Sequence, residues 1–360
     1  MNTSCQNRVE ALRAFMEKEG VTAVLVTKIV NLHYFSGFRG DDTCLVITPK
    51  ETLLITDFRY IEQAHQQTDY EVVEQTQGLF KTAAAELKKR GVRSLAFEGA
   101  ALCYDNWAFM QEELGNGVQM KGVSLEPLRE VKDAEEIACI KKAVAISDLA
   151  FDDVLTYLRP GISELDVAAH MEAFMRAHGS EGPSFTTIIA SGVRGSLPHG
   201  VATGKLLAAG EFVTMDYGAI YQGYHSDITR TVAIGHADEK MRHLYETVLA
   251  SQKLGVQKVQ PGASGKAVDK AVRDFLTEKG YGKNFGHGLG HSLGLEIHEE
   301  PRLSPKSTTE HLLVNMLITV EPGVYIAGYG GLRIEDTVLV TEKGGVPLTQ
   351  ADKRLIEVGA

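Results

Sequence analysis

The chain has 360 residues, of which 44% are hydrophobic and 23% are charged, so it is long enough for two globular domains with a sizeable core. Its formal net charge of −10 argues against a basic surface that follows nucleic-acid phosphates. No apolar run is long enough to span a bilayer. Neither nucleic acid nor a membrane is therefore expected as a partner.

The sequence favours a cytoplasmic location. The N-terminal stretch MNTSCQNRVEALRAFMEKEG alternates charged and apolar residues at helical spacing, which is unlike a secretory signal. The cysteines stand far apart without a C-x-x-C pair, which indicates reduced thiols rather than a disulfide framework or a metal site.

The first third of the chain alternates β-branched runs with helical runs, which predicts a small mixed α/β domain. Strands are expected at 22–27, 43–48, 52–56, 70–75 and 94–98. Helices are expected at 7–19, 58–67, 79–90 and 104–114.

A long helix marks the start of the second part. Asp133 and Glu136 form a D-x-x-E signal for a helix that runs to about Leu158. We therefore expect one domain over residues 1–128 and another over residues 129–360.

The second part contains a faint internal repeat. RPGISELDVAAHMEAFMRAHG (159–179) aligns with QPGASGKAVDKAVRDFLTEKG (260–280). Each copy has Pro-Gly, a serine in the N-cap position, an amphipathic helix and a final glycine. Each copy also comes after another long helix, 133–158 in the first case and 238–258 in the second. Start and stop signals of this kind are common in helices, but a similar pair of strands after each copy makes chance resemblance a poor explanation.

A β-hairpin is expected after each copy. In EFVTMDYGAIYQGYHSDITRTVAI (211–234), a turn centred between Tyr221 and Gln222 would place Asp216 directly opposite Asp227.

In the second copy, NMLITVEPGVYIAGYGGLRIEDTVLV (315–340), a turn centred on Gly328 would place Glu321 opposite Glu335. Opposed like charges destabilise a sheet, and burial makes them worse unless a cation neutralises them. Two such pairs set in apolar runs therefore predict bound metal, with room for two divalent ions that share a water.

The stretch GHGLGHSLGLEIHEEP (286–301) carries three histidines among four glycines. His287 and His291 have the spacing of helical zinc sites, but so many glycines argue against a helix. His298 begins HEEPR rather than H-E-x-x-H, so we expect an extended or looped segment. Because glycine has no side chain, the backbone of this segment can pass close to a ligand. One imidazole added to four carboxylates suits manganese, cobalt or iron(II), with zinc as an alternative.

These motifs resemble the metal-dependent pita-bread peptidases, above all the Xaa-Pro aminopeptidases and the Xaa-Pro dipeptidases (prolidases). The resemblance from about residue 130 to the end rests on LPHG (197–200), DYGAIYQGYHSDITRT (216–231), HGLGHSLGLEIHE (287–299), EPGVY (321–325) and LRIEDTVLV (332–340). NLHYFSGF (31–38) and LITDFRYIEQA (54–64) resemble the creatinase-like N-terminal domain. The resemblance implies an α/β (α+β) chain, with that small domain followed by a pita-bread catalytic domain with pseudo-twofold symmetry.

Carried over position by position, the resemblance implies five ligands for two divalent metal ions, which are Asp216, Asp227, His291, Glu321 and Glu335. Asp216 would chelate one ion, while Asp227 and Glu335 would bridge both. His291 and Glu321 would each bind one ion. Manganese is expected first, with cobalt, iron or zinc as alternatives.

The resemblance also implies roles on the substrate side. A water or hydroxide that bridges the metals would attack, and Glu321 would move its proton to the leaving nitrogen. His199 and His298 would hydrogen-bond the scissile carbonyl and the tetrahedral intermediate. His287 would line the proline side of the site. Substrate-binding positions are also implied for Tyr325 and Arg333, and strand periodicity places Arg333 on the same face as Glu335.

The expected activity is metal-dependent hydrolysis of the Xaa-Pro bond at peptide N-termini, that is, an Xaa-Pro aminopeptidase acting on peptides with proline in second position. A prolidase uses the same metal motifs, so it stays open as an alternative. Methionine aminopeptidase normally lacks the N-terminal domain, and creatinase-type amidinohydrolases do not use the metal. A metal-free pita-bread binding module would be expected to lose ligands that are all in place here. The resemblance further implies a homodimer.

Overall fold

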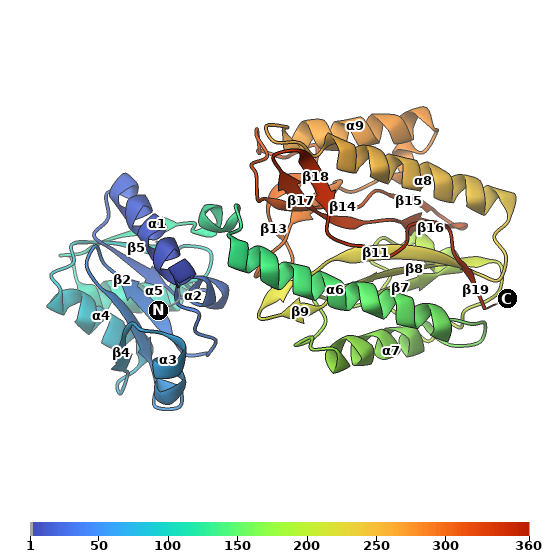
Figure 1. Cartoon of the computed structure of the whole chain (residues 1–360). Coiled ribbons are helices and arrows are strands. Elements are labelled where there is room, and N and C mark those ends of the chain that lie inside the picture. The colour runs from blue at the N-terminus through green and yellow to red at the C-terminus, as the bar shows by residue number, and fades with distance from the viewer. Residues whose placement is uncertain (1–2, 360) are drawn as a thin grey trace. The chain divides into compact units, whose positions relative to one another are not determined.

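The computed structural model of the protein describes residues 3–359, and its internal contacts divide the chain into two compact units. The N-terminal unit is Met1–Arg129 and the C-terminal unit is Glu130–Ala360. Each unit has its own helices and strands (Figure 1). Within residues 3–359, no helix is both long enough and apolar enough to cross a bilayer.

A six-stranded mixed sheet forms the centre of the N-terminal unit, in the order β4-β3-β2-β1-β5-β6. Its strands are β1 (Ala23–Val26), β2 (Cys44–Ile47), β3 (Thr52–Thr56), β4 (Glu71–Glu74), β5 (Ser94–Glu98) and β6 (Gln119–Val123). Its helices are α1 (Thr3–Glu19), α2 (Ile29–Ser36), α3 (Ile61–Gln67), α4 (Leu79–Lys89), α5 (Tyr104–Leu114) and the 3₁₀ helix η1 (Glu126–Arg129). All strands and helices expected in this region form, with small shifts at their ends.

Three elements of this unit, α2, β6 and the short 3₁₀ helix η1, were not predicted from the sequence. The chain directly before α2 is held by a distant carboxylate, since Glu98 accepts from the backbone nitrogens of Thr27 at 2.6 Å and of Lys28 at 2.7 Å. Strand β6, with the sequence QMKGV, is a largely exposed edge strand, so it has no apolar alternation to reveal it.

The C-terminal unit contains two larger sheets, in the orders β19-β11-β8-β7 and β14-β17-β18. Its strands are β7 (Ile188–Ser191), β8 (Glu211–Tyr217), β9 (Ile220–Tyr221), β10 (Tyr224–His225), β11 (Ile228–Ile234), β12 (Gly290–Ser292), β13 (Glu299–Leu303), β14 (Leu317–Val320), β15 (Gly323–Ile326), β16 (Gly330–Arg333), β17 (Asp336–Thr341), β18 (Gly344–Pro347) and β19 (Glu357–Val358).

Helices cover these sheets from two sides. They are α6 (Ala134–Tyr157), α7 (Glu164–Ala177), α8 (Glu239–Lys258) and α9 (Gly265–Glu278), with the 3₁₀ helices η2 (Gly192–Ser196) and η3 (Gly282–Asn284). Figure 1 shows α8 and α9 at the top of this unit and α7 at its bottom. One core packs α6 and α7 against β8 and β11, and another packs α8 and α9 against β14 and β17.

The predicted internal repeat is confirmed. Ser163 and Ser264 occupy the N-cap positions of α7 and α9, and each side chain accepts a hydrogen bond from a backbone nitrogen in the first turn. Gly179 and Gly280 come after these helices with φ of 99° and 87°, which only glycine adopts freely. Each copy leads into a hairpin, β8–β11 or β14–β17, that belongs to one of the two larger sheets.

The predicted register of the first hairpin is wrong by one residue at the turn. The two-residue loop is Gln222–Gly223, whose φ values of 49° and 80° are those of a type I′ turn. Asp216 therefore pairs with Thr229 and not with Asp227. Because Asp227 and Thr229 are two residues apart, the two aspartates still share a face of the hairpin as diagonal neighbours.

The predicted register of the second hairpin is confirmed. On one side of the glutamates Val320 pairs with Asp336, and on the other side Gly323 pairs with Arg333. The same register on both sides places Glu321 opposite Glu335, with the turn centred on Gly328 as expected.

Candidate metal centre

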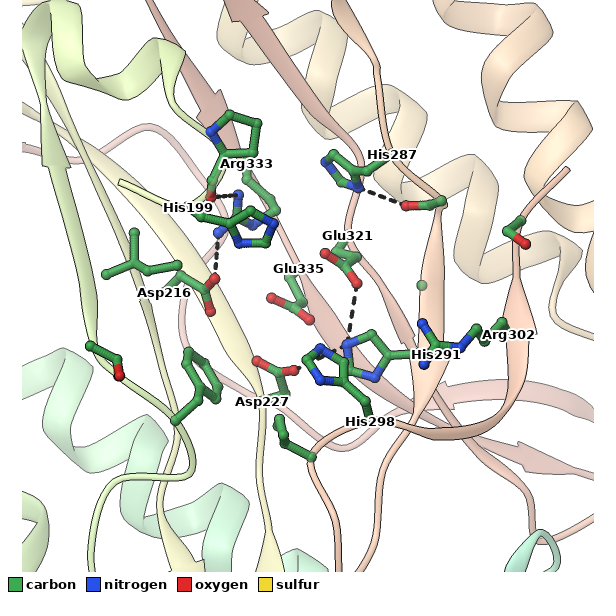
Figure 2. Close-up of a pocket in the computed structure, with 18 of the residues that line it drawn as sticks. His199, Asp216, Asp227, His287, His291, His298, Arg302, Glu321, Arg333 and Glu335 are labelled. Atoms are coloured by element: carbon green, nitrogen blue, oxygen red, sulfur yellow. Dashed lines mark hydrogen bonds and ion pairs between the residues drawn. The ribbon is translucent and has the colours of Figure 1, made fainter. Parts of the chain in front are cut away.

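Strands from both halves of the internal repeat bring the five predicted ligands to one cavity. Asp216 lies in β8, and Asp227 immediately precedes β11. Glu321 comes directly after β14, Glu335 precedes β17 and His291 lies in β12. All five line a cavity of about 680 Å³ (Figure 2).

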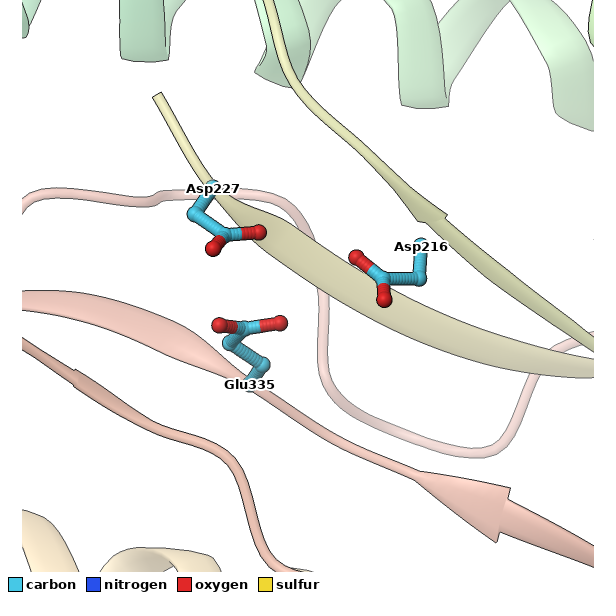
Figure 3. Close-up of side chains that lie close together, drawn as sticks. All are labelled: Asp216, Asp227 and Glu335. Carbon is cyan, nitrogen blue, oxygen red and sulfur yellow. The ribbon is translucent and has the colours of Figure 1, made fainter. Parts of the chain in front are cut away.

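Asp216, Asp227 and Glu335 form a buried carboxylate cluster, in which one oxygen of each residue lies within 4.8 Å of the others (Figure 3). Burial and the neighbouring carboxylates raise the pKa of Asp227 and of Glu335 well above the usual range. Oδ1 of Asp216 and Oε1 of Glu335 are buried, and neither has a hydrogen-bond partner within the described residues. Such oxygens are costly unless a cation neutralises them, so the cluster fits a divalent metal ion.

His291 presents a nitrogen lone pair to the carboxylates. Its Nδ1 donates to the carbonyl oxygen of Ser292 at 3.0 Å, which leaves Nε2 unprotonated. Nε2 lies 3.6 Å from Oδ2 of Asp227 and 3.5 Å from Oε1 of Glu321. Burial lowers the pKa of His291 to about 3, so the ring is neutral at pH 7. Because lone pairs face each other across these gaps, His291 fits as a nitrogen ligand of a shared metal ion.

Two threonines that the sequence analysis did not identify orient the ligands. Oγ1 of Thr229 donates to Oε2 of Glu335 at 2.6 Å. Oγ1 of Thr319 donates to Oε1 of Glu321 at 3.1 Å and accepts from the backbone nitrogen of His291 at 3.0 Å. Each threonine lies two residues from a predicted ligand along the same strand direction, and that periodicity was the signal that could have revealed it.

Arg333, Tyr325 and His287 form a hydrogen-bonded chain beside the cluster. Nη2 of Arg333 contacts Oδ2 of Asp216, and Nη1 donates to the Tyr325 hydroxyl at 2.7 Å. Nδ1 of His287 donates to the carbonyl oxygen of Gly288, so the Tyr325 hydroxyl donates to Nε2 of His287, at 2.9 Å. His287 and Arg333 line the cavity, whereas Tyr325 is not among its lining residues and acts through its two partners.

His199 and His298, for which the resemblance implies contacts with the substrate carbonyl, line the same cavity. His298 immediately precedes β13, and its ring packs against that of His291 with 4.4 Å between the centroids. Burial lowers the pKa of His298, which favours the neutral ring. His199 lies in the loop after η2 (Figure 2).

The apolar wall of the cavity and one of its cations were not predicted from the sequence. The apolar lining residues are Phe185, Ile188, Pro198, Val201 and Ile297. Arg302 also lines the cavity, and its Nε donates to Oε1 of Glu300 at 3.3 Å. Several of these side chains come from loops, where no periodic pattern marks a residue that faces a ligand.

Comparison with known proteins agrees with this geometry. The model of metallopeptidase family M24 matches residues 138–342, and the model of the creatinase/prolidase N-terminal domain matches residues 8–131. The Xaa-Pro dipeptidase of Pyrococcus furiosus is 40% identical over 98% of this chain and 100% of that protein.

Solved structures extend this agreement to the fold. The structure of an Xaa-Pro dipeptidase from Bacillus anthracis has a TM-score of 0.95 and 40% identity, covering 98% of this chain and 100% of that one. An X-Pro aminopeptidase structure from Thermotoga maritima has a TM-score of 0.90 and 36% identity, covering 94% and 98%. The predicted architecture, a creatinase-like N-terminal domain followed by a pita-bread domain, is therefore confirmed.

Proposed function

The chain belongs to metallopeptidase family M24, and from that premise we propose that it hydrolyses the bond between an N-terminal residue and proline with two divalent metal ions. The observation that carries the proposal is the convergence of four carboxylates and one neutral imidazole on one cavity, with two buried oxygens unpaired within residues 3–359. The names of similar proteins support proline as the second residue of the substrate.

The number and kind of donors support two ions rather than one. Four carboxylates and one imidazole offer more donor atoms than a single ion of this class usually takes. The predominance of oxygen favours manganese, with cobalt, iron(II) or zinc as alternatives. Bound there, the ions would polarise the scissile carbonyl and lower the pKa of the attacking water.

Glu321 is the group suited to move the proton. Burial raises its pKa to about 7 in the metal-free protein, and a bound cation would hold the carboxylate in the deprotonated form that accepts a proton. It would take the proton of the attacking water and deliver it to the proline nitrogen, which must be protonated to leave. The hydrogen bond from Thr319 holds one oxygen of Glu321 in place for this transfer.

His199 and His298 would bind the carbonyl oxygen as negative charge develops on it. Both rings line the cavity, and a neutral imidazole still has one N–H to donate. The Xaa-Pro bond is a tertiary amide without an N–H. A site that binds the carbonyl oxygen, and needs no N–H of the scissile bond, therefore suits it. His287 and the apolar side chains would contact the proline ring.

Arg302 favours dipeptides over longer peptides. In an Xaa-Pro dipeptide the proline carries the C-terminal carboxylate, and a guanidinium in the cavity wall is the group that would pair with it. Release of the first residue from longer peptides, the activity expected from the sequence, is the second candidate, supported by the similarity to an X-Pro aminopeptidase.

The test is a hydrolysis assay on protein stripped with EDTA and reloaded with manganese. Ala-Pro, Ala-Pro-Ala and the control Ala-Ala would be compared by chromatography of the products. We expect metal-dependent cleavage of Ala-Pro with the highest kcat/KM and little cleavage of Ala-Ala. Failure to cleave either proline peptide after reloading with each of the four metals would refute the proposed function.

Two further expectations belong with this proposal. A homodimer predicts a light-scattering mass twice that of the chain, and a cytoplasmic location predicts recovery of the protein in the soluble cytoplasmic fraction of its host.

A further inference from the structure

Glu164 is a fully buried carboxylate that the proposed mechanism does not use. It lies in the first turn of α7, and its side chain has 0% exposure. Its Oε1 accepts from the backbone nitrogen and from Oγ of Ser191, both at 2.8 Å. Its Oε2 accepts from Nη1 of Arg194 at 2.6 Å, and from the backbone nitrogen and Oγ1 of Thr203 at 3.1 Å and 2.8 Å. All five donors therefore belong to one segment, Ser191–Thr203, and they include both of its ends.

This segment carries His199, and its backbone alone determines where that histidine lies. Within residues 3–359, no hydrogen bond to the His199 ring is present. Arg194 strengthens the segment from inside, because its Nη2 donates to the carbonyl oxygen of Val201 at 2.7 Å. Other hydrogen bonds also hold the segment, since Nη1 of Arg333 donates to the carbonyl oxygen of Pro198 at 3.2 Å and the backbone nitrogen of Leu165 donates to the carbonyl oxygen of Thr203 at 3.0 Å. The side chain of Glu164 is the group that joins the two ends of the segment to each other.

The carboxylate of Glu164 is not needed to build the helix on which it stands. Ser163 and Asp166 already form a complete capping box at the start of α7. The repeated helix α9 has the same serine cap, Ser264, but it has Gly265 where α7 has Glu164. The carboxylate is thus a feature of the half that carries His199 and not of the repeated fold.

We propose that Glu164 is a positioning residue that clamps both ends of Ser191–Thr203 and so holds His199 against the substrate carbonyl. This inference rests on the proposed function only for the step that His199 performs. The clamp itself is a structural statement, and it can be tested without any activity.

Hydrogen exchange measured by mass spectrometry tests the clamp directly. In Glu164→Gln, an NH₂ group replaces one of the two oxygens that accept these hydrogen bonds, so donors would face a donor. We therefore expect hydrogen exchange of the backbone amides of 192–202 to rise roughly tenfold to a hundredfold. Asp166→Asn is the matched control, because it removes one carboxylate from the same helix start without touching the segment. Exchange of 192–202 that is the same in wild type and Glu164→Gln overturns the inference.

Kinetics then tests whether the clamp acts through His199. On Ala-Pro we expect Glu164→Gln to lower kcat roughly tenfold to a hundredfold while the manganese content is unchanged. Added to His199→Ala, the same substitution should cost almost nothing more, because the ring it positions is gone. Independent, multiplicative losses would overturn the positioning role, since damage to the fold in general would produce them.

A milder variant covers the case in which Glu164→Gln does not fold. Thr203→Val removes one donor but keeps the shape, so we expect a smaller rise in exchange of 192–202 and a roughly two- to fivefold loss of kcat. No change in either quantity contradicts the clamp. Inactive wild-type enzyme would instead refute the proposed function, and the exchange results would still decide the clamp.

Discussion

The metal-free protein should lose stability as the pH rises from 6.5 to 8.5. Glu321 has a pKa of about 7 in the folded protein, whereas an unfolded glutamate has its ordinary value of about 4.5. A raised carboxyl pKa stabilises the fold while the group is protonated, so this contribution is complete below about pH 4.5 and disappears as the pH rises through 7.

The size of this effect can be worked out from the two pKa values. Across the whole range Glu321 contributes roughly 3 kcal/mol, of which about 1 kcal/mol is lost between pH 6.5 and 8.5. Asp227 and Glu335, whose pKa values are also raised, act in the same direction. The lowered pKa values of His287 and His291 act in the opposite direction, because an unfolded histidine is still half protonated at pH 6.5. Each of them adds roughly 0.4 kcal/mol of stability between pH 6.5 and 8.5, so the contribution of Glu321 is isolated by comparison with a variant that lacks its charge.

Thermal unfolding after EDTA treatment measures this loss. Between pH 6.5 and 8.5, we expect the Tm of the wild type to fall by roughly 1–2 °C more than that of Glu321→Gln. Glu321→Gln, which stays neutral at every pH, should show a smaller fall. With manganese the trend should reverse, because the metal binds the deprotonated ligands. A metal-free wild type whose Tm changes over this window by the same amount as that of Glu321→Gln would refute the reasoning.

Three further substitutions test the site and its support. Asp227→Asn should abolish stoichiometric manganese binding, measured by elemental analysis, and lower kcat/KM by more than about a hundredfold, whereas a fully active preparation would contradict the two-metal proposal. Lys132→Met should lower the free energy of unfolding by roughly 3–5 kcal/mol, because Lys132 is 1% exposed and lies 3.2 Å from the buried carboxylate of Glu299. In urea titrations, the double variant with Glu299→Gln should recover much of that loss. If the single and the double variant lose the same free energy of unfolding, the charge pair is not the cause. Arg302→Met should raise the KM for Ala-Pro roughly tenfold or more but change the KM for Ala-Pro-Ala much less, and equal changes would remove the argument for a dipeptide.

The sequence predicted the ligand hairpins well because strand periodicity survives small errors. Moving the first turn to Gln222–Gly223 changed the partner of Asp216 but not its face, so the two aspartates remained on the cavity side. In the second hairpin, the glycines around Gly328 marked the turn closely enough to give the correct register.

What the sequence could not reveal depends on contacts between distant segments. The backbone directly before helix α2 is held by Glu98, which is far away in the chain, so no local signal marks where the helix starts. The clamp of Glu164 joins the start of α7 to a loop that looks irregular in the sequence. Phe185, Pro198, Val201 and Ile297 face the cavity because of how loops pack, which neither periodicity nor spacing encodes.

The division of the ligands between the two repeated halves affects how the protein assembles. Asp216 and Asp227 come from the first half, while His291, Glu321 and Glu335 come from the second, so neither half alone offers the complete set. Metal uptake during refolding should therefore lag behind helix formation and report the moment at which the halves meet. Bound ions would then stabilise the contact between the two halves at a late stage of folding. In a host starved of metal, the halves would separate more easily, and the chains would be degraded sooner.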